Sequence, residues 1–339
     1  MHRINSSLQT NQVFALPKKL PLYGCGALNW DIFFEVDDLE EFSFEGFQFF
    51  PGEEYVFERK SFLELYENLK REKRFLAEGG GGSSANTIYA LAKMGFKCGF
   101  IGAVGEDPFG EKILEELKAL SVDTSCVIKG GETSLALIFL DKKKDRAIVV
   151  SPGTAESYLS YETLKSLLPR SGLIHLSSFA STEGKSFHLA LLSAFEGIIS
   201  LDPGEIYAKE GKDFLSPFLK KAKFLFITEK ELKLSCISVE ELLEKNLKGL
   251  FIKMGSKGAL AITRNYCVRG SVYPPERVVD NTGAGDYFNA GVLAGILLGI
   301  PLEEALDLGL YSASVSLRDF GRKGVLSYQE FKNFLSRLK

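Results

Sequence analysis

The chain has 339 residues, of which 45% are hydrophobic and 25% are charged, a composition ordinary for a globular protein with a large core. Its net charge of -3 and pI near 5.9 provide no overall attraction to nucleic acid or anionic membranes. The five scattered cysteines and three histidines form no Cys-x-x-Cys pair and no cluster. We therefore expect a cytoplasmic protein with reduced thiols, without a zinc site.

The sequence contains no segment typical of a secreted or membrane-spanning protein. Residues 1–20 lack the continuous apolar core of a signal peptide. The longest apolar run, 290–298, is far shorter than the roughly 20 residues that cross a bilayer. We expect no membrane or nucleic-acid partner.

Short apolar runs alternate with amphipathic stretches along most of the chain. Between the runs lie helical patterns such as 110–120, for which Asp107 provides a cap and Pro108 a suitable first turn. The alternation predicts an α/β fold around a mostly parallel sheet, with ligands beyond the carboxyl ends of the strands. The runs interpreted as strands are 22–28, 98–104, 173–177, 197–202, 223–228 and 250–255.

Two regions interrupt this alternation. Residues 134–150 resemble a hairpin with a charged turn, and the lysine run 142–144 either belongs to that turn or contacts an anionic substrate. Residues 32–57 are acidic and aromatic, and a charged helical stretch, 58–74, follows. These pieces predict a small projecting sheet, whose aromatic cluster closes over a substrate, packs a dimer or covers its own helix.

Residues 278–295, VVDNTGAGDYFNAGVLAG, place glycines and a carboxylate between a β-type start and an apolar helix. The N–H groups of Gly283, Ala284 and Gly285 can converge at the helix N-terminus and form an anion site. Asp286 in the first turn is then a candidate proton acceptor, so the pair suits phosphoryl transfer to a hydroxyl. The alternative is that the glycines allow close packing and Asp286 caps the helix.

A second glycine cluster, GGGGSSANTIYALAKMG at 79–95, also leads into a helix, which we expect to end at Gly95. It is not a P-loop, because no Gly-Lys-Ser/Thr follows. The stretch GCGALNWD at 24–31 is not a dinucleotide fingerprint either, since Asn29 replaces the third glycine.

Together these stretches resemble the PfkB, or ribokinase-like, family of carbohydrate and nucleoside kinases. Residues 79–95 with 99–110 look like its N-terminal signature, and DNTGAGDYFNAG at 280–291 looks like its C-terminal one. The resemblance implies a single ribokinase-like domain over residues 1–339. Its fold would be a three-layer α/β/α sandwich around a mostly parallel sheet, with a small β-sheet lid formed by residues 32–57 and 121–150.

The resemblance also implies roles for individual residues. Asp286 would be the catalytic base, and Gly283, Ala284 and Gly285 the anion hole. On the acceptor side, the matching residues are Asp31, Gly81, Gly82 and Asn86. Asp31 could instead be a turn residue, and Asn86 a helix cap.

On the nucleotide side, the resemblance assigns ATP to KMGSKGAL at 253–260 and to the small-residue stretch 312–321. The segment 228–231 falls where the family has an Asn-x-x-Glu motif that is tied to magnesium and phosphate. Glu231 matches the glutamate of this motif and would be an indirect Mg²⁺ contact. Thr228 replaces the asparagine, so we expect altered affinity rather than a loss of activity. Lys257 could be a solvated turn lysine. The residues implied for ATP are Thr228, Glu231, Gly255, Ser256 and Gly258, and a monovalent cation such as K⁺ would lie at Asp280, Thr282 and the 316–321 loop.

The acceptor is less defined. The stretch HLSSFAS at 175–181 differs from the Ser-Gly-Ser segment of the family's phosphosugar kinases. We therefore expect an unphosphorylated sugar or a sugar acid first and a nucleoside second, in a protein that could form a homodimer through the lid. A non-catalytic sugar- or nucleotide-binding protein and a hydride-transfer enzyme are the rival interpretations.

Overall fold

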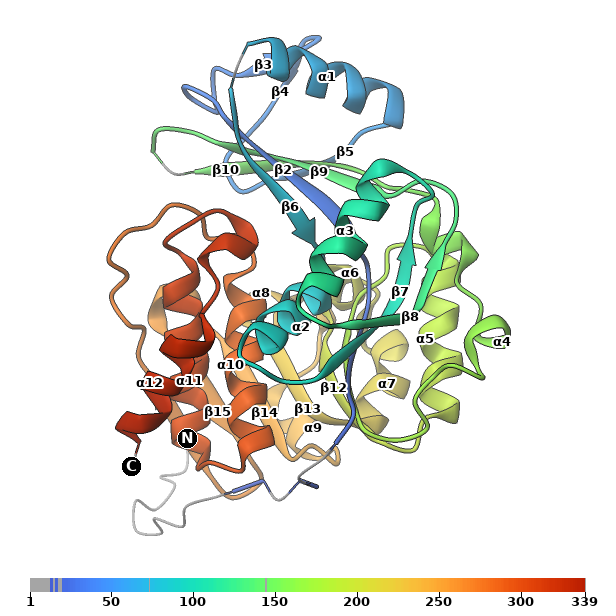
Figure 1. Cartoon of the computed structure of the whole chain (residues 1–339). Helices are drawn as coiled ribbons and strands as arrows, with labels where there is room; N and C mark the ends of the chain where they lie inside the picture. Colours follow the sequence, from blue (N-terminus) through green and yellow to red (C-terminus); the bar gives the residue numbers. More distant parts are fainter. Residues whose placement is uncertain (1–12, 15, 18–19, 73, 144, 339) are drawn as a thin grey trace.

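The computed structural model describes residues 13–338, with the exception of residues 15, 18, 19, 73 and 144. Residues 1–12, where the sequence predicts no signal peptide, and Lys144 of the lysine run lie outside the described residues. The fold contains a nine-stranded sheet covered by helices and a five-stranded sheet that projects from it (Figure 1). Every helix in the described part of the chain is too short or too polar to cross a membrane.

The large sheet has the strand order β16-β15-β14-β13-β12-β11-β1-β7-β8. The strands from β14 to β8 pair in parallel, and β15 and β16 are added antiparallel at one edge. All six runs interpreted as strands lie in this sheet, so the predicted mostly parallel core is confirmed. Its strands are β1 (Leu22–Cys25), β7 (Cys98–Val104), β8 (Asp123–Lys129), β11 (Leu173–Ser177), β12 (Ile198–Asp202), β13 (Ala222–Thr228), β14 (Gly249–Lys253), β15 (Ala259–Ile262) and β16 (Cys267–Gly270).

Helices cover both faces of the large sheet, which is why central strands such as β7 and β11 are buried along their whole length, whereas the edge strands β8 and β16 are partly exposed. In β13, Phe224 and Phe226 join one core cluster, whereas Leu225 and Ile227 join the other. The first cluster contains residues of α2 (Ser83–Lys93), α3 (Pro108–Ala119), α10 (Ala284–Leu298), α11 (Leu302–Ser316) and α12 (Tyr328–Arg337). The second contains residues of α4 (Tyr161–Leu164), α5 (Thr182–Ala194), α6 (Gly204–Lys209), α7 (Gly211–Lys221), α8 (Glu229–Ser235) and α9 (Val239–Leu243).

Local signals at two helices match the structure. Asp107 caps α3 through bonds from the N–H groups of Phe109 and Gly110, with Pro108 as the first residue, as predicted. Helix α2 ends at Lys93, and Gly95 follows in the left-handed region with φ of 96°. Both helix assignments from the sequence are therefore confirmed.

The small sheet, the lid, has the strand order β5-β10-β9-β2-β6. The antiparallel pair β9 and β10 confirms the predicted hairpin. The expected lid limits are wrong in two places: β8 pairs in parallel with β7 in the large sheet, and residues 75–81 form the edge strand of the lid. The lid strands are β2 (Asn29–Glu35), β5 (Glu54–Val56), β6 (Phe75–Gly81), β9 (Ser134–Leu140) and β10 (Arg146–Ser151).

The outer face of the lid carries α1 (Arg59–Arg71) and a two-stranded hairpin, β3 (Ser43–Phe44) and β4 (Phe47–Gln48) (Figure 1). The aromatic cluster packs here: Phe49 is fully buried against Phe42 and Phe139, in the same core as Phe62 of α1. This packing favours the interpretation that the cluster covers its own sheet and helix. A homodimer through the lid stays a prediction.

The charged turn of the β9–β10 hairpin forms ion pairs with the segment that follows β2. Lys142 forms an ion pair with Asp37 at 2.8 Å, and Lys143 forms one with Asp38, also at 2.8 Å. The side chains of both lysines are mostly exposed. These contacts favour a solvated turn over a substrate contact for these two lysines.

Candidate active site

Helix α10 begins directly after Gly283, which has the left-handed φ of 75° that glycine adopts without strain. Within the described residues, the N–H groups of Gly283 and Gly285 have no hydrogen-bond partner. Free donors and the positive end of the helix dipole therefore meet at one point, an arrangement that binds anions. The preceding Val278 and Val279 lie in a loop, so their interpretation as the start of a strand is wrong; Val279 N–H donates to the carbonyl of Leu317.

The Asp286 carboxylate lies in the first turn of α10 and points to helix α2. Ser83 Oγ donates to its Oδ1 at 2.7 Å, and Asn86 Nδ2 donates to its Oδ2 at 3.0 Å. No side chain caps the start of α10, so the capping interpretation of Asp286 is wrong. Burial and the nearby Asp202 raise the pKa of Asp286 to about 6, although these two hydrogen bonds oppose the rise. Near neutral pH the carboxylate is ionised and able to accept a proton.

Asp31 lies in strand β2 of the lid, not in a turn, and is only 9% exposed. Asn29 Nδ2 donates to its Oδ1 at 2.5 Å. Burial raises the pKa of Asp31 to about 7, despite the opposing effects of Arg322 and Asn29. A carboxyl group of this kind can accept or donate hydrogen bonds to hydroxyl groups near neutral pH.

Two successive glycines, Gly81 and Gly82, leave no room for a side chain between β6 and α2. Gly81 pairs with Asn29 across the lid, and a Cβ on Gly81 would lie 2.3 Å from Asp31 Oδ2. Gly82, with φ of 101°, precedes α2, and a Cβ there would lie 2.1 Å from the carbonyl oxygen of Ala27. Both positions therefore require glycine for steric reasons.

Asn86 lies inside α2 rather than at its cap, because Gly82 occupies the N-cap position. Its Oδ1 accepts from Arg322 Nε at 3.0 Å, which leaves the amide NH₂ facing Asp286. Arg322 is 5% exposed and also donates to Glu116 Oε2 at 3.0 Å and to the carbonyl of Gly81 at 3.2 Å. One buried guanidinium thus connects the lid edge, α2 and α3.

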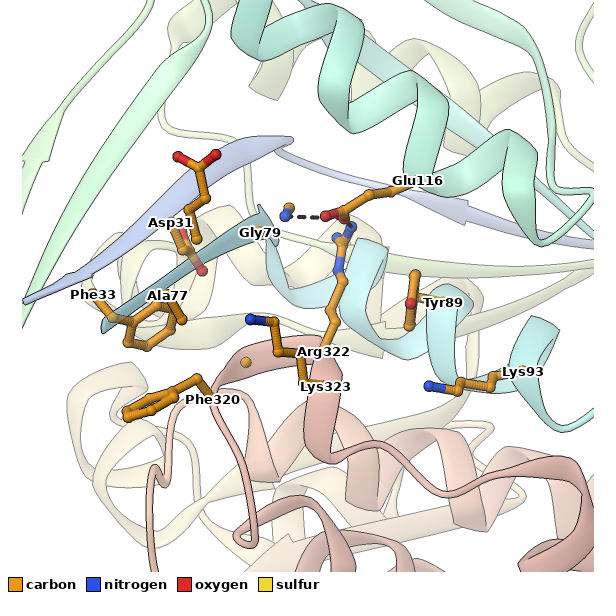
Figure 2. Close-up of a pocket in the computed structure, with 13 residues that line it drawn as sticks. Asp31, Phe33, Ala77, Gly79, Tyr89, Lys93, Glu116, Phe320, Arg322 and Lys323 are labelled. Atoms are coloured by element: carbon orange, nitrogen blue, oxygen red, sulfur yellow. Dashed lines mark hydrogen bonds and ion pairs between the residues drawn. The ribbon is translucent and has the colours of Figure 1, made fainter. Parts of the chain in front are cut away.

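A pocket of about 310 Å³ opens beside these residues, between the lid edge β6, helix α2 and the segment after α11 (Figure 2). Asp31 and Phe33 reach it from the lid, and Phe320 faces Phe33 across it with ring centroids 5.7 Å apart. Its volume is at the lower end for small-molecule sites. The lining residues are Asp31, Phe33, Ala77, Glu78, Gly79, Gly80, Tyr89, Lys93, Glu116, Phe320, Gly321, Arg322 and Lys323.

The predicted nucleotide residues lie at the carboxyl ends of β13 and β14. Thr228 caps α8 and forms a capping box with Glu231: each side chain accepts the backbone N–H of the other. Thr228 therefore acts as a helix cap in this structure. Gly255 and Ser256 lie in the exposed turn η2 (Gly255–Lys257), and Gly258 follows with φ of 90°.

Asp280 and Thr282 lie beside the loop that follows α11. Asp280 is 3% exposed; its Oδ1 accepts from Thr282 N–H at 2.8 Å and its Oδ2 accepts from Gly321 N–H at 2.9 Å. The expected contact between this carboxylate and the 316–321 loop is therefore present. Among the described residues, no three His, Cys, Asp or Glu side chains are grouped so as to hold a metal ion.

Sequence reasoning missed three residues of this site. Ser83 belongs to the GGSSAN motif, and its position between Gly82 and Asn86, both expected on the acceptor side, could have indicated that it contributes to the site. Arg322 follows the 316–321 loop. Arg146, in the charged hairpin, reaches from the lid to the anion site, where its Nη1 donates to Asn281 Oδ1 at 2.6 Å and to Thr282 Oγ1 at 3.1 Å.

Comparison with known proteins identifies related sequences. The model of the pfkB family of carbohydrate kinases matches residues 55–326. An uncharacterized sugar kinase of Archaeoglobus fulgidus is 31% identical over 243 residues, which cover 69% of this chain and 96% of that protein. A nucleoside kinase of Methanocaldococcus jannaschii is 27% identical over 245 residues, 69% of this chain and 78% of that protein.

Solved structures show the same fold. The crystal structure of the Methanocaldococcus jannaschii nucleoside kinase, an archaeal member of the ribokinase family, has a TM-score of 0.73 and 22% identity. The alignment covers 94% of this chain and 99% of that one. The ribokinase-like α/β/α fold predicted from the sequence is therefore confirmed.

Proposed function

The chain belongs to the PfkB family of carbohydrate kinases, and on this premise we propose that it transfers the γ-phosphoryl group of ATP to a hydroxyl of an unphosphorylated sugar or a sugar acid. As a sugar or nucleoside kinase, it is a phosphotransferase with an alcohol acceptor. The observation that carries the proposal is the 3.0 Å hydrogen bond from Asn86 to Asp286. This bond brings acceptor-side residues of α2 next to a carboxylate at an anion-binding helix end.

The proposed reaction uses Asp286 as the base. The acceptor hydroxyl gives its proton to Asp286 while a bond forms between the acceptor oxygen and the γ-phosphorus. The bond from that phosphorus to the β,γ-bridging oxygen breaks, and ADP leaves with its electron pair. The free N–H groups of Gly283 and Gly285 would stabilise the charge of the transferred group. The N–H of Ala284, the third residue assigned to the anion hole, donates to the carbonyl of Asn281 at 3.4 Å in this structure.

The lid side would orient the acceptor. Asp31 and Asn86 offer oxygen acceptors and an amide to neighbouring hydroxyls, and Gly81 and Gly82 let the acceptor approach the backbone. Arg146 of the lid donates hydrogen bonds to Asn281 and Thr282, which directly precede Gly283. Its guanidinium group would therefore lie on the lid side of the transferred group. Arg146 would thus supply a positive charge from the lid where phosphoryl transfer needs it.

The nucleotide would bind across β13 and β14, at Thr228, Glu231, Gly255, Ser256 and Gly258. Kinases of this family use ATP with a divalent metal, which supplies charge neutralisation when bound. We assign Mg²⁺ to this role, with Glu231 as its indirect protein contact, because Mg²⁺ in kinase sites is usually held by one or two carboxylates together with the phosphates of the substrate.

A monovalent cation would be held at Asp280 and Thr282, next to the 316–321 loop. The buried Asp280 carboxylate accepts two backbone N–H groups and has no ion-pair partner within the described residues. Oxygen donors of this kind suit a hard cation such as K⁺.

A nucleoside is the second candidate acceptor. Phe33 and Phe320 form an aromatic pair beside Asp31, which offers apolar surface to a nucleobase. The Methanocaldococcus jannaschii relative is named a nucleoside kinase, which supports this alternative.

ADP release from MgATP across a panel of sugars, sugar acids, sugar phosphates and nucleosides tests the proposal, beside the Asp286→Asn variant. We expect one strong acceptor, and a loss of at least about 10³-fold in turnover in the variant with ATP binding retained. Near-normal turnover in Asp286→Asn would remove Asp286 as the base. A folded protein that binds ATP but releases no ADP with any acceptor would favour the non-catalytic binding protein. Stabilisation by NAD instead of ATP in a melting experiment would favour a hydride-transfer enzyme.

A further inference from the structure

Lys253 is a buried lysine at the anion site that the roles above leave unused. It is the last residue of β14, and its side chain is only 12% exposed. A Cβ built on Gly285 would lie 3.4 Å from Lys253 Nζ, which is its nearest neighbour. The ammonium group therefore lies beside the backbone of the first turn of α10, where the free N–H groups are.

Asp202 fixes the position of this ammonium group, and Asn289 in turn fixes Asp202. Lys253 Nζ lies 2.5 Å from Asp202 Oδ2, and Asn289 Nδ2 donates to the same oxygen at 2.6 Å. Asp202 is the last residue of β12 and Asn289 lies one turn after Asp286 in α10. Because parallel strands end at the same edge of the sheet, β12 and β14 bring their terminal side chains together below the helix end.

The surroundings of Lys253 are acidic. The pKa of Lys253 is raised by three nearby carboxylates, those of Asp202, Glu231 and Asp286. His175, which lies near Asp202, is neutral at physiological pH, because burial lowers its pKa to about 4. Burial alone would lower the pKa of Lys253, but Asp202 and Glu231 outweigh it and raise the pKa. The lysine is therefore charged whenever the enzyme is folded and active.

A phosphoryl group that entered this site would meet three carboxylates. Without a cation, their repulsion would oppose the binding of the group at the helix end. Lys253 is the only Lys or Arg among the described residues that forms an ion pair with one of these three carboxylates. The Lys253 side chain keeps 12% of its surface exposed, so it is not completely enclosed by the core.

We propose that Lys253 is a further catalytic residue, whose ammonium group contacts the transferred phosphoryl group at the Gly283–Gly285 turn. Asp202 and Asn289 position the ammonium group in advance, so no reorganisation is needed during the reaction. In the same location, Lys253 also favours the ionised form of Asp286. This inference rests on the proposed kinase function.

The test compares Lys253→Met with Lys253→Arg and with Lys248→Met, a matched control. Lys248 is exposed and directly precedes β14, at the opposite end of the strand from Lys253 and outside the segments assigned to the nucleotide. The affinities of the magnesium complexes of ADP and of the non-hydrolysable analogue AMP-PNP are measured by calorimetry, without acceptor. Turnover is then measured with the best acceptor.

If Lys253 contacts the γ-phosphoryl group, Lys253→Met weakens AMP-PNP binding at least about 10-fold and leaves ADP binding within about twofold. Turnover falls by roughly 10²–10³-fold, as for the loss of one oxyanion donor, and Lys253→Arg recovers part of it. The acid limb of the pH–rate profile moves to higher pH, because Asp286 loses a neighbouring positive charge. The control variant changes none of these quantities.

Equal weakening of ADP and AMP-PNP, or turnover retained in a folded Lys253→Met, would overturn the proposal. Because the variant leaves Asp202 buried without its partner, Lys253→Met with Asp202→Asn provides a second test that removes both charges. This double variant must show the same selective loss of AMP-PNP affinity. The nucleotide affinities are measured without an acceptor, so they test the role of Lys253 even if no acceptor is found. A wild-type protein that binds neither ADP nor AMP-PNP would refute both the kinase function and the role of Lys253.

Discussion

Removal of the Ser83 hydroxyl is expected to change the pH dependence of the reaction rather than its maximum rate. Ser83 Oγ donates to Asp286 Oδ1 at 2.7 Å, and this bond favours the ionised carboxylate. Burial and Asp202 raise the pKa of Asp286 to about 6, while Asn86, Ser83 and Lys253 oppose the rise. In Ser83→Ala, one of the opposing contributions is absent, so the pKa rises further.

The size of the effect follows from the bond. A hydrogen bond to a charged group contributes about 1.5 kcal/mol or more, and about 1.4 kcal/mol corresponds to one pH unit. The pKa of Asp286 should therefore move from about 6 to about 7. At pH 6 the ionised fraction then falls from about one half to about one tenth, and kcat falls roughly fivefold. At pH 9 both proteins have an ionised base and similar kcat.

The assay measures ADP directly by chromatography at saturating substrates between pH 5 and pH 9, so no coupling enzyme affects the profile. Ser84→Ala is the matched control, because Ser84 is the neighbouring residue and its buried Oγ has no partner within the described residues. Its profile should follow that of the wild type. An unchanged acid limb in Ser83→Ala would refute the assignment of that limb to Asp286, and an equal loss at every pH would point to a positional role of the hydroxyl.

Three further changes test other parts of the site. Asp31→Ala should lower kcat/KM for the acceptor by roughly 100-fold with the KM for ATP nearly unchanged, because hydrogen bonds to the acceptor are lost; equal effects on both substrates would contradict an acceptor role. Gly82→Ala should destabilise the protein by about 2–4 kcal/mol in urea unfolding, since φ of 101° and a 2.1 Å approach to the Ala27 carbonyl exclude a side chain; a loss below about 1 kcal/mol would show that the turn relaxes. Arg322→Gln should lower kcat and shift the acid limb to higher pH, because Asn86 loses the donor that orients its amide, whereas a change in melting temperature alone would mean a purely structural Arg322.

The sequence contained most of the local structure. Runs such as 223–228 and 250–255 are apolar on both faces, so they form buried parallel strands regardless of the details around them. The Asp107-Pro108 start and the glycine at 95 define the ends of their helices through interactions within a few residues. The strand order of the lid could not be predicted in the same way, because β8 could pair with either sheet and only long-range packing decides between them.

In the candidate site, too, some features follow from the local sequence and others depend on the tertiary structure. The sequence by itself determined that Gly283, with its positive φ, precedes a helix with an acidic first turn, because these are properties of one short segment. Only the tertiary structure decided what surrounds Asp286: Ser83 and Asn86 are 203 and 200 residues away in the chain. The pKa of Asp286, the orientation of Asn86 by Arg322 and the pairing of Lys253 with Asp202 all depend on burial and on distances of about 3 Å between separate elements. Side-chain chemistry at that range is set by the packing of helices and strands, which no local pattern of residues specifies.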